Sequence, residues 1–243
     1  MSLSATQLNF ELRDLYLQKL SKIYTTIRTH AVDSQLKNLH GPFLIEVQPE
    51  YLEASKKIMF VGMETHGWRK CDLGEDLMIS YQKVMECHRE FMSQEKPINS
   101  PFWWFMRDLN AVYQQSDLRK TVLWTNLSKI DVGKSRPTGQ LFNNTMAGFI
   151  DLLVEEIDLL KPAIVVIMTS SPNYRWHLGE HLGLTTGLAR REELMPRLLY
   201  RWTADKLPTN TFQICHPNSL RFRKGGFKQN AEVIIGKIRE LAI

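Results

Sequence analysis

The chain has 243 residues, of which 43% are hydrophobic and 10% aromatic, and its formal net charge is +5 at pH 7. These values indicate a globular protein with a full core, and the positive excess suits a protein that meets phosphate groups. No run reaches the roughly 18–20 apolar residues of a membrane span, and the N-terminus has no signal-peptide pattern. Three cysteines without CxxC spacing argue against a disulfide framework. The sequence therefore predicts a reduced, cytoplasmic protein with no membrane partner.

Helical stretches and short apolar strands alternate along the chain. Helices are expected at about residues 4–30, 74–92, 102–115, 143–160 and 227–241, with a short one opening at Ser170-Ser171-Pro172. Strands are expected at about residues 58–62, 121–127, 163–168, 198–203 and 211–215. This alternation predicts a three-layer α/β/α sandwich with a central, mainly parallel sheet. We expect residues 1–243 to form a single domain with an N-terminal helical extension over about residues 1–50.

Two motifs that point to other chemistries are set aside. Gly133-Lys134-Ser135 resembles the end of a phosphate-binding loop, but Ser128 stands where that motif requires a glycine. His177-Leu178-Gly179-Glu180-His181 fits a zinc pattern, but its helix is short and no downstream acidic ligand is evident. Exposed helix histidines explain that pattern better, and we expect no metal.

Three polar side chains follow predicted strands at the point where each strand ends. Glu64 comes just after the strand that ends in Gly62, Asn126 lies at the end of the next strand, and His216 follows the last one. Side chains at the carboxyl edge of such a sheet converge on the ligand crevice. An amide can pair with a base edge, an imidazole can donate to an oxygen that gains charge, and a carboxylate can stabilise a sugar cation or orient water. These residue types suit the holding of a base and the cleavage of the bond behind it.

These segments resemble the motifs of the uracil-DNA glycosylase superfamily, over about residues 57–241. Gly62-Met63-Glu64 is similar to the motif that supplies the water-positioning residue, and Val122-Leu123-Trp124-Thr125-Asn126 to the strand whose Asn reads the base. His216-Pro217-Asn218-Ser219-Leu220 is similar to the motif whose His supports the leaving base and whose Leu is a wedge. The resemblance implies that Gly62, Met63 and Asn126 bind the base and that Phe102 or Trp103 stacks on it.

The resemblance further implies a DNA-repair hydrolase that flips a base into a pocket and excises uracil or another modified base, without metal or organic cofactor. Glu64 and His216 would be catalytic, with His66 as a further catalytic or base-contacting group. Leu220 would be the wedge, and the basic residues after it would contact DNA phosphates: Arg221, Arg223 and Lys224. We expect a monomer.

The sequence departs from the superfamily pattern in three places, one of which is Thr65-His66 in place of the usual proline-containing turn. Glu64 stands where Asp or Asn is usual, and the extra methylene moves the carboxylate by about an ångström, enough to misplace a water. Ser219 replaces a proline and leaves the wedge loop less rigid. Two alternatives to base excision therefore stay open: a module that binds nucleic acid or a nucleotide without cleaving it, and hydrolysis of a free nucleoside or of a modified base in RNA.

Overall fold

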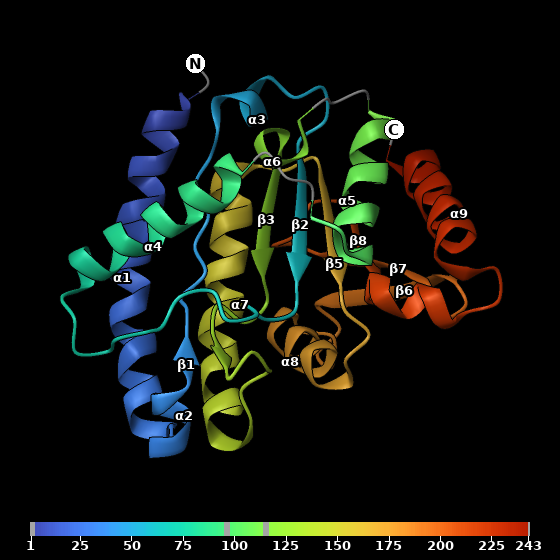
Figure 1. Ribbon diagram of the computed structural model, residues 1–243. Helices are drawn as coiled ribbons and strands as arrows, with labels where there is room; N and C mark the ends of the chain where they lie inside the picture. Colours follow the sequence, from blue (N-terminus) through green and yellow to red (C-terminus); the bar gives the residue numbers. More distant parts are fainter. Residues whose placement is uncertain (1–2, 95–97, 114–116, 243) are drawn as a thin grey trace. The chain divides into compact units, whose positions relative to one another are not determined.

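The computed structural model describes residues 3–94, 98–113 and 117–242, and it has an α/β architecture in which helices flank a six-stranded sheet (Figure 1). The chain divides into two compact units. The first unit comprises Met1–Val47, Met63–Gln94 and Thr125–Leu160. The second unit comprises Gln48–Gly62, Glu95–Trp124 and Lys161–Ile243. The predicted α/β class is confirmed, whereas the expectation of a single domain with a helical extension stays a prediction.

The first unit is mainly helical. Its elements are α1 (Ala5–His30), α2 (Asp33–Lys37), β1 (Leu39–His40), α4 (Leu77–Ser93), β4 (Asp131–Val132) and α7 (Gly139–Leu160). Helix α1 packs against both α4 and α7. The short strands β1 and β4 pair antiparallel, with His40 opposite Asp131. The expected helices at 4–30, 74–92 and 143–160 are confirmed, each within a few residues.

Helix α1 forms where a cap and an apolar stripe agree. Ser4 and Gln7 make a reciprocal capping box at its start, which satisfies two backbone N–H groups that have no partner within the helix. The stripe predicted at i, i+4 spacing is buried along its length: Leu8, Leu12, Tyr16, Leu20, Ile23, Tyr24 and Ile27. Burial of this face against α4 and α7 stabilises the unit, since most helical stability in proteins comes from such packing.

The sheet has the strand order β3-β2-β5-β8-β7-β6. Its strands are β2 (Ile58–Gly62), β3 (Val122–Asn126), β5 (Ile164–Met168), β6 (Ala189–Met195), β7 (Leu199–Ala204) and β8 (Thr211–Ile214). Strands β2 and β5 are buried at every position, as expected for short apolar runs covered on both faces. Five of the six strands are confirmed near their predicted bounds.

The sheet is mixed, and the prediction of a mainly parallel sheet is corrected on this point. Strands β2, β5 and β8 run parallel, but β8 pairs antiparallel with β7, and β7 pairs antiparallel with β6. The reason is the hairpin formed by β6 and β7, because a short turn can join only antiparallel strands. Strand β6 carries the sequence Ala-Arg-Arg-Glu-Glu-Leu-Met and was not expected.

The second unit also contains α3 (Pro49–Glu53), α5 (Pro101–Val112), α6 (Leu118–Thr121), α8 (Pro172–Leu182), the 3-10 helix η1 (Pro217–Phe222) and α9 (Gly226–Leu241). Helices α5, α9 and η1 contact one another, as do α3 and α6. The expected end of the α5 segment, Gln115, lies outside the described residues. Within the described ranges, no helix combines the length and apolarity that a membrane crossing requires.

Candidate functional site

The residues predicted for the site fall into two groups. Glu64, His66 and Asn126 belong to the first unit, and Phe102 and His216 belong to the second. Each group is described by itself, and their joint action on one substrate stays a prediction. Gly62, the last residue of β2, is buried, and Met63 after it is half-buried.

The turn that follows β2 is held by the carboxylate of Asp131, which is fully buried. Its Oδ2 accepts hydrogen bonds from Thr65 Oγ1 (2.5 Å) and the Gly67 backbone N–H (2.8 Å). Its Oδ1 accepts from the Lys134 backbone N–H (2.7 Å) and from His40 Nδ1 (2.9 Å). We call these five residues the Asp131 cluster. Four donors to one carboxylate fix the path of the turn between Glu64 and Gly67, since hydrogen bonds to a charged acceptor are the stronger kind.

Gly67 is required at its position in this turn. Its φ of +72° lies in the left-handed region, and a Cβ there would come within 3.0 Å of the Lys134 side chain. The close approach of the two segments places the exposed His66 beside the backbone of Lys134.

The hydrogen bond of His66 defines which of its ring nitrogens carries the proton. Nδ1 lies 2.9 Å from the carbonyl oxygen of Lys134, and because a carbonyl only accepts, Nδ1 must carry the hydrogen. In the neutral ring Nε2 then keeps its lone pair. His66 is thereby prepared as a proton acceptor on an exposed turn, next to the half-buried carboxylate residue Glu64.

Asn126 closes strand β3 and is 2% exposed. Its amide nitrogen Nδ2 is buried and has no hydrogen-bond partner among the described residues. A buried N–H donor that is left unsatisfied lowers stability by about 1–3 kcal/mol. A ligand atom that accepts a hydrogen bond would therefore be favoured beside Nδ2. The segment after β3 is tied to the turn after β2, because Ser128 N donates to the Met63 carbonyl at 2.8 Å.

A buried ion pair lies in the same segment and was not predicted from the sequence. Lys129 is fully buried, and its Nζ lies 2.9 and 2.7 Å from the two carboxylate oxygens of Glu156 on α7. The same ammonium donates to the hydroxyl of Thr125, the residue before Asn126. Burial lowers the pKa of Lys129, and the Glu156 carboxylate opposes that shift. Tyr16 donates to Glu156 Oε1 at 2.9 Å and accepts from Ile45 N at 3.0 Å, which satisfies the group's remaining polar atoms.

In the second unit, His216 begins the 3-10 helix η1 after strand β8. Its Nδ1 accepts a hydrogen bond from the Asn218 backbone N–H at 3.3 Å, so Nδ1 carries the lone pair and Nε2 carries the hydrogen. Burial lowers the pKa of the imidazole, which keeps the ring neutral near pH 7. His216 and His66 are therefore opposite tautomers: the hydrogen lies on Nε2 in His216 and on Nδ1 in His66, so Nε2 of His216 is a donor.

An aromatic cluster adjoins this imidazole through Phe102. Phe102, near the start of α5, stacks on the His216 ring with centroids 6.1 Å apart and an interplanar angle of 27°. Trp124 on β3 meets Phe102 edge-on at 6.1 Å and Trp103 at 5.1 Å. The structure thus places Phe102 against His216 on one side and against Trp103 and Trp124 on the other. A cluster of this kind offers flat apolar faces beside one oriented donor, which suits a planar ligand.

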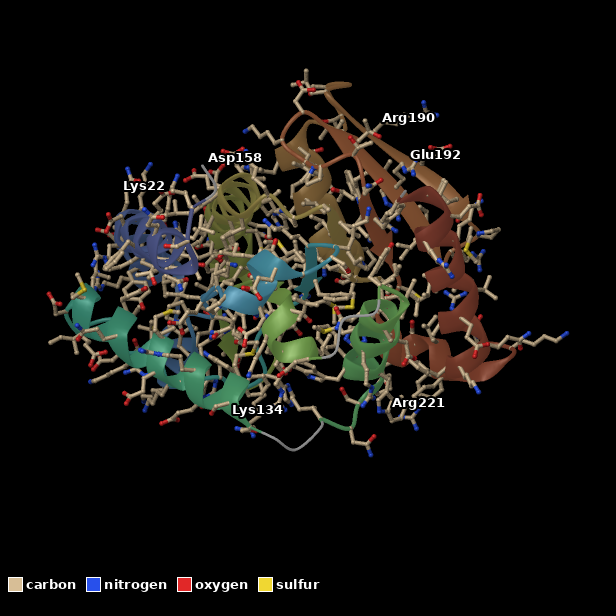
Figure 2. The ribbon with its side chains drawn as sticks, turned by 90° about the horizontal axis from the view of Figure 1, so that it is seen from above. Lys22, Lys134, Asp158, Arg190, Glu192 and Arg221 are labelled. Atoms are coloured by element: carbon tan, nitrogen blue, oxygen red, sulfur yellow. The ribbon has the colours of Figure 1, made fainter. Side chains whose placement is uncertain are left out.

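Helix η1 contains Leu220, the residue predicted to act as the DNA wedge. Leu220, predicted to project into DNA, is fully buried, because η1 packs against α5 and α9. Phe222, two residues later, is 82% exposed. The exposed basic residues Arg221 and Lys224 lie on either side of it along the chain, and Figure 2 shows the Arg221 side chain at the outside of the molecule. Arg223 differs, since its guanidinium donates to the Arg197 carbonyl at 3.0 Å. A buried Leu220 cannot project into DNA, and the expectation for this residue is corrected.

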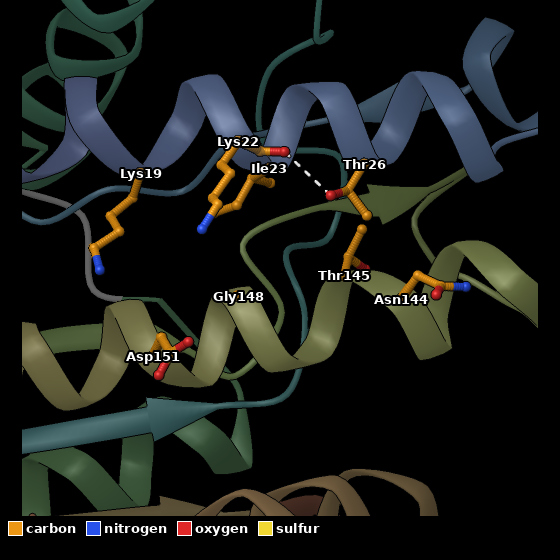
Figure 3. A pocket seen from close by; sticks show the side chains of 8 residues that line it. All are labelled: Lys19, Lys22, Ile23, Thr26, Asn144, Thr145, Gly148 and Asp151. Atoms are coloured by element: carbon orange, nitrogen blue, oxygen red, sulfur yellow. Dashed lines mark hydrogen bonds between the residues drawn. The ribbon is translucent and has the colours of Figure 1, made fainter.

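A groove of about 270 Å³ lies between α1 and α7 in the first unit (Figure 3). It is lined by Lys19, Lys22, Ile23, Thr26, Asn144, Thr145, Gly148 and Asp151. None of these belongs to the predicted site. Among the described residues, no group of three or more His, Cys, Asp or Glu side chains is placed to hold a metal ion.

Comparison with known proteins finds no family model that matches the chain and no significant match among curated proteins.

Proposed function

We propose that the chain is an atypical member of the uracil-DNA glycosylase superfamily, with that superfamily's three-layer α/β/α fold, and that it excises a modified base such as uracil from DNA. The observation that carries the proposal is the state of His216. A neutral imidazole, with Nδ1 engaged by the Asn218 N–H and Nε2–H as donor, stacks on Phe102 beside two tryptophan rings.

The leaving base is the partner proposed for His216. When the bond between the sugar C1′ and the base nitrogen breaks, its electron pair goes to the base and negative charge develops on a carbonyl oxygen of the base. A hydrogen bond from Nε2 of His216 stabilises that charge without any change in the protonation of the ring. The lowered pKa of His216 supports this role, because a protonated ring would lose its hydrogen bond to Asn218.

Asn126 and Phe102 are proposed to hold the flipped base. The buried Nδ2 of Asn126 has no partner among the described residues and would donate to a base oxygen. The ring of Phe102 would stack on the base, a contact worth about 1–3 kcal/mol.

His66 and Glu64 are proposed to complete the hydrolysis. A water attacks C1′, its oxygen forms the new bond, and its proton passes to Nε2 of His66, whose Nδ1–H is engaged by the Lys134 carbonyl. The carboxylate of Glu64 stabilises the positive charge on the sugar. The base anion takes up a proton from solvent and His66 returns its proton to solvent, so the products are an abasic site and the neutral free base, and one water is consumed.

Arg221 and Lys224 are proposed to contact backbone phosphates, with Phe222 between them as the wedge that fills the gap left by the flipped nucleotide. Binding through such contacts weakens as the salt concentration rises, with a slope of about one per phosphate neutralised.

The second candidate function is a module that binds nucleic acid without cleaving it. Glu64 is the feature that favours it, because its longer side chain places the carboxylate where a water-positioning Asp or Asn would not. Under this alternative Asn126, Phe102 and Phe222 keep their binding roles, and no abasic site forms.

The test uses oligonucleotides that carry uracil, hypoxanthine or a thymine mismatch, scored for abasic sites, with DNA affinity measured in parallel. We expect His216→Ala to lower the rate roughly 100- to 1,000-fold while DNA affinity stays within about two-fold. His177→Ala, a histidine on α8 outside the site, is the matched control. Tight DNA binding without abasic product on any substrate would support the binding module instead.

A further inference from the structure

Strand β6 forms one edge of the six-stranded sheet, because it comes last in the strand order and pairs only with β7 among the described strands. Its residues Arg190, Glu192 and Glu193 are exposed. Figure 2 shows the side chains of Arg190 and Glu192 projecting outward from the ribbon at the rim of the molecule. An edge of this length offers backbone N–H and C=O groups to a further strand.

The side chains along one side of this edge form a pattern that is complementary to itself. In the regular part of β6, before its bulge, Arg190 and Glu192 stand at alternate positions on either side of Arg191. Read in reverse, as an antiparallel partner would present it, the order is Glu, Arg. A second copy paired about Arg191 would therefore place each Arg190 opposite Glu192 of its partner. Opposite charges directly across an antiparallel pair are stabilising, and like charges are destabilising.

We propose that β6 is a self-association edge, along which two copies of this chain pair antiparallel about Arg191 and join their sheets. The pairing is symmetric, so each favourable contact occurs twice. This proposal replaces the expectation of a monomer, and it does not depend on the proposed glycosylase activity.

Arg191 is the residue that meets its own copy at the centre of this pairing, and its side chain is already engaged. Its guanidinium carbon lies 3.4 Å from the centroid of the Tyr200 ring, and its Nε donates to Gln213 Oε1 at 2.9 Å. Gln213 in turn accepts from Trp202 Nε1 and donates to the Thr169 carbonyl. These contacts hold each Arg191 guanidinium against its own sheet. In the dimer the two Arg191 charges are therefore kept away from the symmetry axis and from each other.

The charges on β6 also explain why a copy of the chain is the favoured partner. Charged residues and a bulge protect an exposed edge from unspecific pairing, and β6 has both, with a bulge between Glu193 and Met195. A strand without the matching order of charges would place like charges together or leave them unmatched. The chain's own β6 has the matching order.

Sedimentation equilibrium up to about 100 µM protein tests the proposal, a range chosen because a small interface gives modest affinity. We expect the wild-type protein to approach twice its monomer mass of 28.3 kDa. Arg190→Glu and Glu192→Arg should each weaken dimerisation roughly ten-fold, since each places two like-charge pairs at the interface. The double exchange R190E/E192R restores complementarity and should restore the dimer. Lys206→Glu, an exposed charge reversal in the turn after β7, is the matched control.

Register is tested by cross-linking in a Cys87→Ser background, in which the remaining cysteines, Cys71 and Cys215, are buried. Only residue 191 faces its own copy in the proposed register, so Arg191→Cys should give a disulfide-linked dimer with diamide as oxidant, and Glu193→Cys should not. A wild-type protein that stays monomeric over the whole range, or a double exchange that fails to recover the dimer, would overturn the proposal.

Discussion

The two turns that carry histidines of the proposed site are stabilised in different ways. The turn at Glu64–Gly67 is fixed by the Asp131 cluster, whose members come from three separate stretches of the first unit. The turn at His216–Phe222 is fixed locally. Asn218 N donates to the ring nitrogen Nδ1 of His216, and Ser219 N and Oγ both donate to the His216 carbonyl. Leu220 in the same turn is buried.

The first turn is thus stabilised by hydrogen bonds from residues far apart in the sequence. The second turn is stabilised by local hydrogen bonds and by the buried side chain of Leu220. The four donors share one buried acceptor, so loss of the Asp131 carboxylate leaves all four unsatisfied at once. A turn that rests on short-range hydrogen bonds and one leucine tolerates the loss of any single bond. The first turn should therefore fail as a unit, and the second should fail in small steps.

The largest effect is expected from Asp131→Ala. Its removal leaves four donors without their acceptor in a buried site, and we expect the free energy of unfolding to fall by about 4 kcal/mol, as measured by urea denaturation. The exposed Asp205→Ala in the second unit should change it by less than about 0.5 kcal/mol. A small effect of Asp131→Ala would contradict cooperative support of the first turn.

Acid should weaken the first unit through His88, which lies against the rings of Phe43 and Trp68 just beyond the first turn. Burial, with a smaller contribution from Arg89, lowers the pKa of His88 from 6.5 to about 4. The unfolded chain takes up this proton below pH 6.5 and the folded chain does not, so stability is lost as pH falls from about 6.5 to about 4, by roughly 3 kcal/mol. His88→Phe should flatten this part of the stability curve, and an unchanged slope would show that other groups cause it.

Leu220→Ala tests the apolar anchor of the second turn. We expect a loss of about 2–3 kcal/mol from the cavity that it leaves, measured by urea denaturation. Phe222→Ala, in the same helix, should leave stability within about 0.5 kcal/mol and weaken DNA binding instead. If Leu220→Ala weakened DNA binding without loss of stability, Leu220 would be the wedge after all.

The smallest effect is expected from Ser219→Ala, which removes one hydrogen bond to the His216 carbonyl. The cost should be about 1 kcal/mol by urea denaturation. Ser219→Thr keeps the hydroxyl and serves as the control. A loss as large as that of Asp131→Ala would show that the second turn is also cooperative.

Much of the fold could be predicted because the buried strands are continuous apolar runs in the sequence. Runs such as Ile164–Met168 are apolar throughout and flanked by helix signals, so their place in a central sheet follows from composition. Strand β6 was missed because an edge strand of charged residues has no apolar alternation, and with it the antiparallel part of the sheet was missed.

The site was only partly accessible to the same reasoning. His216 with Phe102, and the turn at Glu64, could be named because strand ends and local motifs point to them. Asp131 and Glu156 could not, because their roles depend on partners up to 140 residues away, which no local pattern encodes. The burial of Leu220 likewise depends on the packing of η1 with α5 and α9, and its spacing in the motif carries no information on that.

The Asp131 cluster also has a consequence for the time course of folding. Its bonds join residues separated by 66 positions between Thr65 and Asp131 and by 91 between His40 and Asp131. Contacts between residues far apart in the sequence form late in folding, because the entropy of closing the intervening loop is lost before the contact stabilises the chain. During synthesis on the ribosome, the turn that contains Glu64 and His66 is therefore not fixed by the Asp131 cluster until residues up to Lys134 have left the ribosome.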